Sequence, residues 1–165
     1  MRPSPEPRPA EEPGTAPQHL DLTQLSVGEL LVVWALRMRL ARGPGGPVAG
    51  FRLAFGLAGI EAALASFEGL FGVLQRHCRC DFGLHAPGCR CVSADEMTLA
   101  GVIAALQAGA PLHAHLMAAR LVDAAMLEGF LDHARSLAVS LKTERLHLPV
   151  RPLAGCDGGR PLSVH

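Results

Sequence analysis

Residues 97–119 carry no charged side chain, and this run restricts the possible folds more than any other feature of the sequence. Its polar side chains are limited to Thr98, Gln107, His113 and His115. A surface helix in a monomer normally shows a polar face, so a helix without one must be covered on most sides. Two arrangements meet this requirement: the helix is buried within its own chain, or its uncovered face is a surface for self-association or for a partner.

Helical periodicity and helix-start signals divide the chain into four predicted helices. Ser26-x-x-Glu29 and Ser93-x-x-Glu96 are capping boxes, in which the serine and glutamate side chains satisfy free N–H groups at a helix start. The first box opens a helix that ends before the glycine- and proline-rich residues 43–47, and the second opens a helix over residues 94–108. The remaining predicted helices span residues 50–76 and 112–143.

No stretch shows the alternating pattern of a strand, so the predicted fold class is all-α. Short loops between long helices place sequential helices antiparallel, which gives a four-helix up-down bundle-like domain with a cysteine-rich loop between the second and third helices. We expect one helical domain over residues 24–145. A disordered proline-rich tail at residues 1–23 precedes it, and a loosely ordered tail at residues 146–165 follows it.

The charge composition narrows the classes of partner. The chain has 15 acidic and 15 basic residues, and so lacks the basic excess that nucleic-acid binding needs. Arg52, Glu61 and Glu68 interrupt the second apolar segment, which is therefore not a membrane span. The first residues contain no apolar signal-peptide core, so we expect a cytoplasmic protein whose cysteines are reduced thiols or metal ligands rather than disulfides.

Residues 77–91 concentrate the side chains that can bind a metal or act as thiols. They hold four of the five cysteines, arranged as two Cys-x-Cys pairs. In an extended segment, residues i and i+2 point the same way, so each pair can present two sulfurs to one centre. The Pro-Gly turn between the pairs allows them to meet. The candidate ligands are Cys78, Cys80, Cys89, Cys91, His77 and His85.

We expect the four sulfurs to share one tetrahedral zinc ion, with His77 or His85 able to replace a sulfur, and a small iron–sulfur centre as the second choice. Redox or disulfide pairing and metal-free thiols remain as alternatives. Cys156 lies apart from the cluster in a glycine-rich segment and is interpreted as a free thiol.

The sequence contains no nucleophile elbow, phosphate-binding loop or His-Glu-x-x-His motif, so a non-enzymatic role is favoured. The leading hypothesis is an interaction or regulatory module with a structural zinc site. Two rivals stay open. The first is a metal- or thiol-dependent enzyme or an iron–sulfur electron carrier that uses the cysteines directly, and the second is a helical protein with no metal.

The uncharged residues 97–119 suggest a homodimer or a protein partner. If the third helix touches only the second and fourth, a face of small residues looks outward, and a second copy is the commonest cover for such a face. This face consists of Gly101, Ala104, Ala105 and Ala108. Alternatively, the tails fold over it, with Leu146, Leu148 and Val150 lying along the helix.

Overall fold

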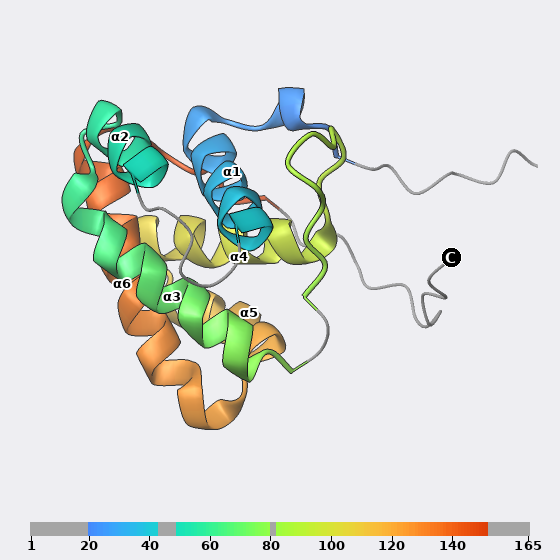
Figure 1. Cartoon of the computed structure of the whole chain (residues 1–165). Helices are drawn as coiled ribbons and strands as arrows, with labels where there is room; N and C mark the ends of the chain where they lie inside the picture. Colours follow the sequence, from blue (N-terminus) through green and yellow to red (C-terminus); the bar gives the residue numbers. More distant parts are fainter. Residues whose placement is uncertain (1–19, 43–48, 80–81, 152–165) are drawn as a thin grey trace, which may run out of the picture.

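The computed structural model describes residues 20–42, 49–79 and 82–151 (Figure 1). Within these residues the chain forms helices and no strand, which confirms the all-α class. The α-helices are α1 (Val27–Arg42), α2 (Ala49–Leu57), α3 (Leu64–His77), α4 (Ala94–Gln107), α5 (Pro111–Leu121) and α6 (Leu127–Thr143). The 3-10 helices are η1 (Leu22–Gln24), η2 (Glu61–Ala63) and η3 (Ala124–Met126). Residues 1–19 and 152–165 of the predicted tails lie outside the described part.

Both predicted capping boxes are present and set the starts of α1 and α4. At α1, the Glu29 N–H donates to the Ser26 hydroxyl at 3.2 Å, and the Ser26 N–H donates to the Glu29 carboxylate at 2.7 Å. At α4, the Glu96 N–H donates to the Ser93 hydroxyl at 3.0 Å, and the Ser93 N–H donates to the Glu96 carboxylate at 2.9 Å. These local signals depend on four consecutive residues, and the predicted helix starts are confirmed.

The predicted continuous helix over residues 50–76 is wrong, because the chain turns at Gly59 between α2 and α3. Gly59 has φ 74°, a left-handed conformation that glycine adopts without steric cost. The Ile60 N–H donates to the Phe55 carbonyl at 2.8 Å, and the Gly59 N–H donates to the Gly56 carbonyl at 3.0 Å. These are the two hydrogen bonds of a Schellman helix ending. A Cβ on Gly59 would lie 2.9 Å from a carboxylate oxygen of Glu144, so glycine also lets the end of α6 come close.

The predicted helix over residues 112–143 is also divided, at Val122, although no glycine or proline marks the break. Val122 is extended, with φ −128° and ψ 159°, and forms an isolated antiparallel bridge with Cys78. Beside it, the Asp123 N–H donates to the His77 carbonyl at 3.0 Å. The end of α3 therefore exchanges hydrogen bonds with the turn between α5 and α6, and this tertiary pairing overrides the local helical preference.

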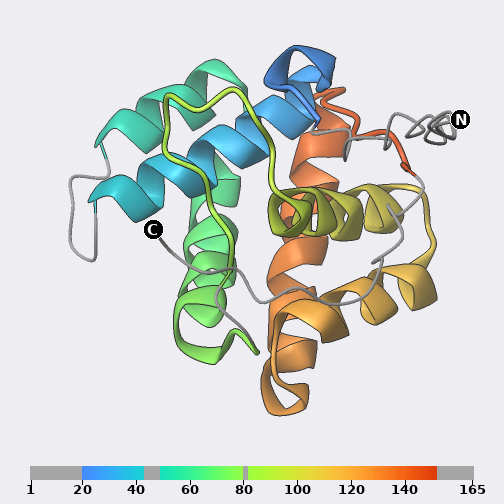
Figure 2. The same cartoon turned by 90° about the vertical axis from the view of Figure 1, so that its right-hand side faces the viewer.

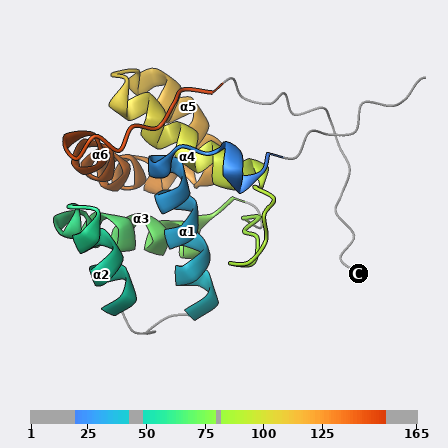
Figure 3. The same cartoon turned by 90° about the horizontal axis from the view of Figure 1, so that it is seen from above.

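Helix α4, which is uncharged from residue 97 onward, lies in the interior, in contact with α1, α5 and α6 (Figure 1, Figure 3). Ala104 and Ala105 are each 1% exposed, and a Cβ on Gly101 would lie 3.0 Å from the sulfur of Met117 in α5. The prediction that this face looks outward is wrong for Gly101, Ala104 and Ala105, whereas Ala108, after the end of the helix, is exposed. The break at Val122 produces two helices, α5 and α6, that contact α4 where one was expected. Dimerisation itself stays a prediction, but the small-residue face of α4 no longer supports it.

Residues 146–151 continue past α6 and cross the end of α4. The Gln107 amide donates to the Leu146 carbonyl at 3.1 Å and accepts from the Leu148 N–H at 2.9 Å. Leu148 is buried, whereas Val150 is exposed. Part of the segment that was predicted to be loose is therefore hydrogen-bonded to Gln107 near the end of α4.

Phenylalanine rings join α2 to α3 at the centre of the core. Phe51 and Phe55 of α2 pack on Phe67 of α3, with ring centroids 6.1 and 5.5 Å apart. Trp34 of α1 packs on the other side of Phe51 at 5.7 Å and remains 36% exposed. None of the described helices is both long and apolar enough to cross a membrane.

Candidate functional site

The segment that joins α3 to α4, here named the cysteine loop (residues 82–93), folds back onto the start of α4 and runs beside α1 (Figure 2). The Gly83 N–H donates to the Asp95 carboxylate at 2.8 Å, and the Ser93 hydroxyl donates to the Gly83 carbonyl. The His85 N–H donates to the Glu96 carboxylate at 3.3 Å. The first half of the loop is therefore attached to the same residues that cap α4.

A buried arginine of α1 holds the second half of the loop. The Arg37 guanidinium contacts both carboxylate oxygens of Glu96, at 2.6 and 2.8 Å, and both side chains are almost fully buried. Its remaining N–H groups donate to the Cys89 carbonyl at 2.6 Å and the Cys91 carbonyl at 2.7 Å. The hydrogen bond that Arg37 donates to Glu96 raises the pKa of Arg37 despite the opposing effect of burial. The backbone at both cysteines is thus fixed by charge-assisted hydrogen bonds.

The opposite edge of the loop pairs with the residues before α1. The Leu22 N–H donates to the Arg90 carbonyl at 2.9 Å, and the Val92 N–H donates to the Leu20 carbonyl at 2.8 Å. Asp21 and Cys91 form an isolated antiparallel bridge between these two hydrogen bonds. The cysteine pair therefore lies between a buried ion pair and a short antiparallel ladder, and its backbone has little freedom to move.

Cys89 and Cys91 bring their thiols together, as the Cys-x-Cys spacing predicts. Cys89 is half-buried, Cys91 is exposed, and both are free cysteines. A hydrogen bond with Cys89 and the charge of its thiolate raise the pKa of Cys91, and burial and the Asp21 carboxylate act in the same direction. Arg37 opposes this shift. The shift follows from two ionisable sulfurs lying close together.

The other predicted ligands do not join this pair within the described residues, where no three His, Cys, Asp or Glu side chains form a group that could hold a metal ion. Cys78 lies at the end of α3, bridged to Val122. His77 ends α3, and His85 is fixed through its backbone N–H. Cys80, like Cys156, lies outside the described residues. The four-sulfur centre expected from the sequence therefore has no support in the described part of the chain.

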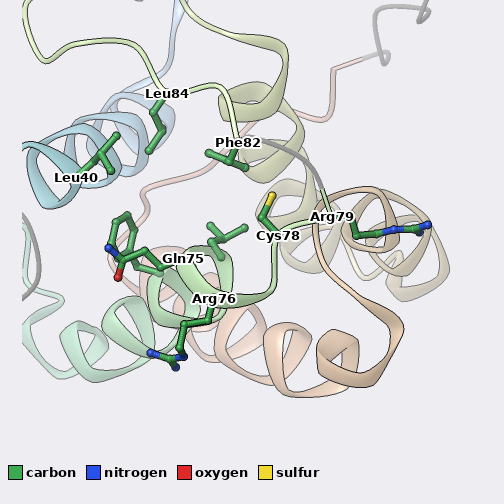
Figure 4. Close-up of a pocket in the computed structure, with 9 residues that line it drawn as sticks. Leu40, Gln75, Arg76, Cys78, Arg79, Phe82 and Leu84 are labelled. Carbon is green, nitrogen blue, oxygen red and sulfur yellow. The ribbon is translucent and has the colours of Figure 1, made fainter.

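Cys78 lines a different feature, a pocket of about 590 Å³ between α1, α3 and the cysteine loop (Figure 4). This volume is within the range of small-molecule sites. The sulfur of Cys78 points toward Phe82, whereas Arg76 and Arg79 point away from the pocket. The described lining residues include no carboxylate or imidazole that could deprotonate the thiol. They are Leu40, Phe71, Leu74, Gln75, Arg76, Cys78, Arg79, Phe82 and Leu84.

Comparison of the chain with protein-family models, with curated proteins and with solved structures found no match. The geometry of the cysteine loop is therefore the basis for inferring a function.

Sequence reasoning missed the part that Arg37 plays in this site. With Arg39 and Arg42 it resembles the basic residues that favour a helix C-terminus. A signal was available, because Arg37 lies four residues after the buried Val33 and next to Leu36, on the apolar stripe of α1. A buried arginine on such a stripe needs an acidic partner, and in the structure Glu96 in the first turn of α4 is that partner.

Proposed function

We propose that this protein is a non-enzymatic helical module whose Cys89–Cys91 pair binds a thiophilic metal ion, with zinc as the preferred ion. One observation carries the proposal: two adjacent thiols lie on a loop whose carbonyl groups are held by the buried Arg37–Glu96 pair. Thiolates select soft or borderline ions such as zinc. In this proposal the metal-bound loop is a fixed surface feature through which the module interacts or is regulated.

The electrostatics of the pair favour a cation between the sulfurs. The pKa of Cys91 is raised because of the hydrogen bond with Cys89 and the charge of a neighbouring thiolate. A divalent cation that contacts both sulfurs replaces this repulsion with attraction and displaces both protons. Because the backbone is already fixed, binding costs little ordering of the loop.

The same pair could instead serve as a redox-sensitive dithiol, but the raised pKa of Cys91 disfavours that role. Thiol–disulfide exchange proceeds through the thiolate, and a higher pKa leaves less thiolate at neutral pH. An iron–sulfur centre at this pair would need further ligands, as zinc would, because the described residues bring two sulfurs together.

Metal analysis of the reduced, purified full-length chain tests the proposal, together with the near-ultraviolet absorption of thiolate–metal bonds. We expect the wild type to bind zinc, and the double variant Cys89→Ser/Cys91→Ser to lose it while its far-ultraviolet circular dichroism stays unchanged. Cys78→Ser is the matched control, because it removes another free cysteine of the same region, and it should keep the metal.

Three outcomes would contradict this assignment. A wild type without zinc whose Cys89–Cys91 peptide has lost two hydrogen atoms would favour the redox role. Zinc that persists in the double variant would place the metal elsewhere. Loss of zinc from Cys78→Ser as well would favour the centre of four cysteines expected from the sequence.

A further inference from the structure

The Cys89–Cys91 pair supplies two sulfur ligands, whereas zinc in closed protein sites takes four. Within residues 20–42, 49–79 and 82–151, no third His, Cys, Asp or Glu side chain joins the two thiols in a group that could hold a metal. A zinc ion at this pair therefore has two coordination positions that the described part of the chain does not fill.

We propose that a second copy of this chain fills those positions, so that one zinc ion joins the Cys89–Cys91 pairs of two chains. The inference rests on the proposed function and adds the partner. A tetrahedral ion has a two-fold axis that relates one pair of its ligands to the other. A symmetric dimer places equivalent surfaces on each side of such an axis, so the two copies complete the coordination without any other ligand.

The position of the pair is open to a second chain. Cys91 is exposed, and the cysteine loop lies at an edge of the described fold, beside α1 and η1 (Figure 1). Arg37 from the inside and Leu22 from the neighbouring segment hold the loop backbone. A rigid pair at an edge can approach its symmetry mate with little ordering of either chain.

Two arginines lie near the pair, each in an ion pair with a carboxylate. Four thiolates around one zinc ion carry a net charge of about −2. Arg90, between the two cysteines in sequence, is 74% exposed and brings a positive charge from each copy. The Arg37 guanidinium lies behind the loop on the Cys89 and Cys91 carbonyls. The Asp21 carboxylate lies 3.4 Å from the Arg90 guanidinium and offsets its positive charge, so this pair adds no net charge beside the centre.

Zinc titration of the reduced full-length chain tests the bridge, with light scattering to give the mass and native mass spectrometry to give the stoichiometry. We expect the mass to double as zinc is added, with one zinc ion per two chains, and a chelator to restore the monomer. Cys89→Ser/Cys91→Ser should stay monomeric with zinc. The matched control Cys78→Ser/Cys80→Ser, which removes the other Cys-x-Cys pair, should keep the zinc-dependent dimer.

The other outcomes separate failure of the bridge from failure of the proposed function. A monomer with one zinc ion per chain overturns the bridge and leaves the metal site standing. No zinc binding overturns both. A dimer that survives chelation overturns the bridge, since another surface then joins the chains. Loss of the dimer in Cys78→Ser/Cys80→Ser also overturns it, because the first cysteine pair is then part of the centre.

Discussion

Helices α1 and α4 start with the same four-residue motif, but the glutamates of the two motifs bind arginines that differ in exposure. In each, a serine hydroxyl accepts a hydrogen bond from the backbone of a glutamate, whose carboxylate accepts one in return. In each, that carboxylate also binds an arginine from a distant part of the chain. Glu29 lies 2.7 Å from Arg151, and Glu96 lies 2.6 Å from Arg37.

The two arginines lie in different surroundings. Arg151 is 33% exposed and ties residues after α6 to the start of α1, whereas Arg37 is 2% exposed and ties the cysteine loop to the interior. Water can replace part of what Arg151 provides, but it cannot reach Glu96 to replace Arg37. Both glutamates are almost fully buried, so the two boxes differ in the exposure of the arginine. The comparison teaches that a capping box predicts where a helix begins, while the burial of the arginine that binds its glutamate decides how much stability depends on the ion pair.

The largest expected effect comes from truncating the two arginines to the same apolar residue. Arg37→Met leaves the buried Glu96 carboxylate without its cation, a change that typically costs about 3–5 kcal/mol. Arg151→Met removes a cation that is 33% exposed, so water can take its place beside the otherwise buried Glu29 carboxylate, and the cost should be smaller, about 1–3 kcal/mol. Urea unfolding followed by circular dichroism gives both free energies. Equal losses in the two variants would show that burial does not distinguish the two boxes.

A smaller effect is expected from removing the two capping hydroxyls. Ser26→Ala and Ser93→Ala should each cost about 1 kcal/mol, the usual contribution of an N-cap. Ser93 also donates to the Gly83 carbonyl, so Ser93→Ala should additionally speed amide hydrogen exchange within the cysteine loop. Ser26→Ala is the control and should leave exchange in that loop unchanged. Loop exchange that is equally fast in both variants would contradict the tethering role of Ser93.

The smallest expected effect is a dependence on pH at Glu29. Burial raises the pKa of this carboxyl, but the hydrogen bonds from Arg151 and Ser26 together outweigh it, so the net pKa is lowered. A lowered pKa gives stability that is present above the pKa of the unfolded chain, about 4.3, and is lost as the pH falls toward the folded value. The advantage of the wild type over Glu29→Gln should therefore shrink below about pH 4.3. Unfolding midpoints from pH 7 downward test this, and an advantage that grows in acid would refute it.

Local signals in the sequence were sufficient for the starts of α1 and α4 and for the Cys89–Cys91 pair. The capping boxes act over four residues, and the cysteines act over three, so neither depends on how the rest of the chain packs. The all-α class follows for a similar reason, because the periodicity of apolar residues is a property of each segment.

Features that depend on distant partners could not be predicted in the same way. Val122 carries no break signal and is extended because it pairs with Cys78. Arg37 resembles a helix-end cation until Glu96 is placed beside it. Ala105 was expected to need a second chain as its cover, but it is buried within its own chain, where α4 contacts both α5 and α6. The division into these two helices is itself a tertiary effect. Whether the two cysteine pairs meet is a question of the same kind.

The packing of Trp34 on Phe51 makes the intrinsic fluorescence of the protein a probe of the contact between α1 and α2. The sequence contains one tryptophan and no tyrosine, so its intrinsic fluorescence originates almost entirely from this side chain. Because the ring is 36% exposed and packs on Phe51 where α1 meets α2, its emission should report the docking of these two helices rather than the state of the α4 interior. A fluorescence transition that precedes the circular dichroism transition would then measure how far α2 separates before the remaining helices unfold.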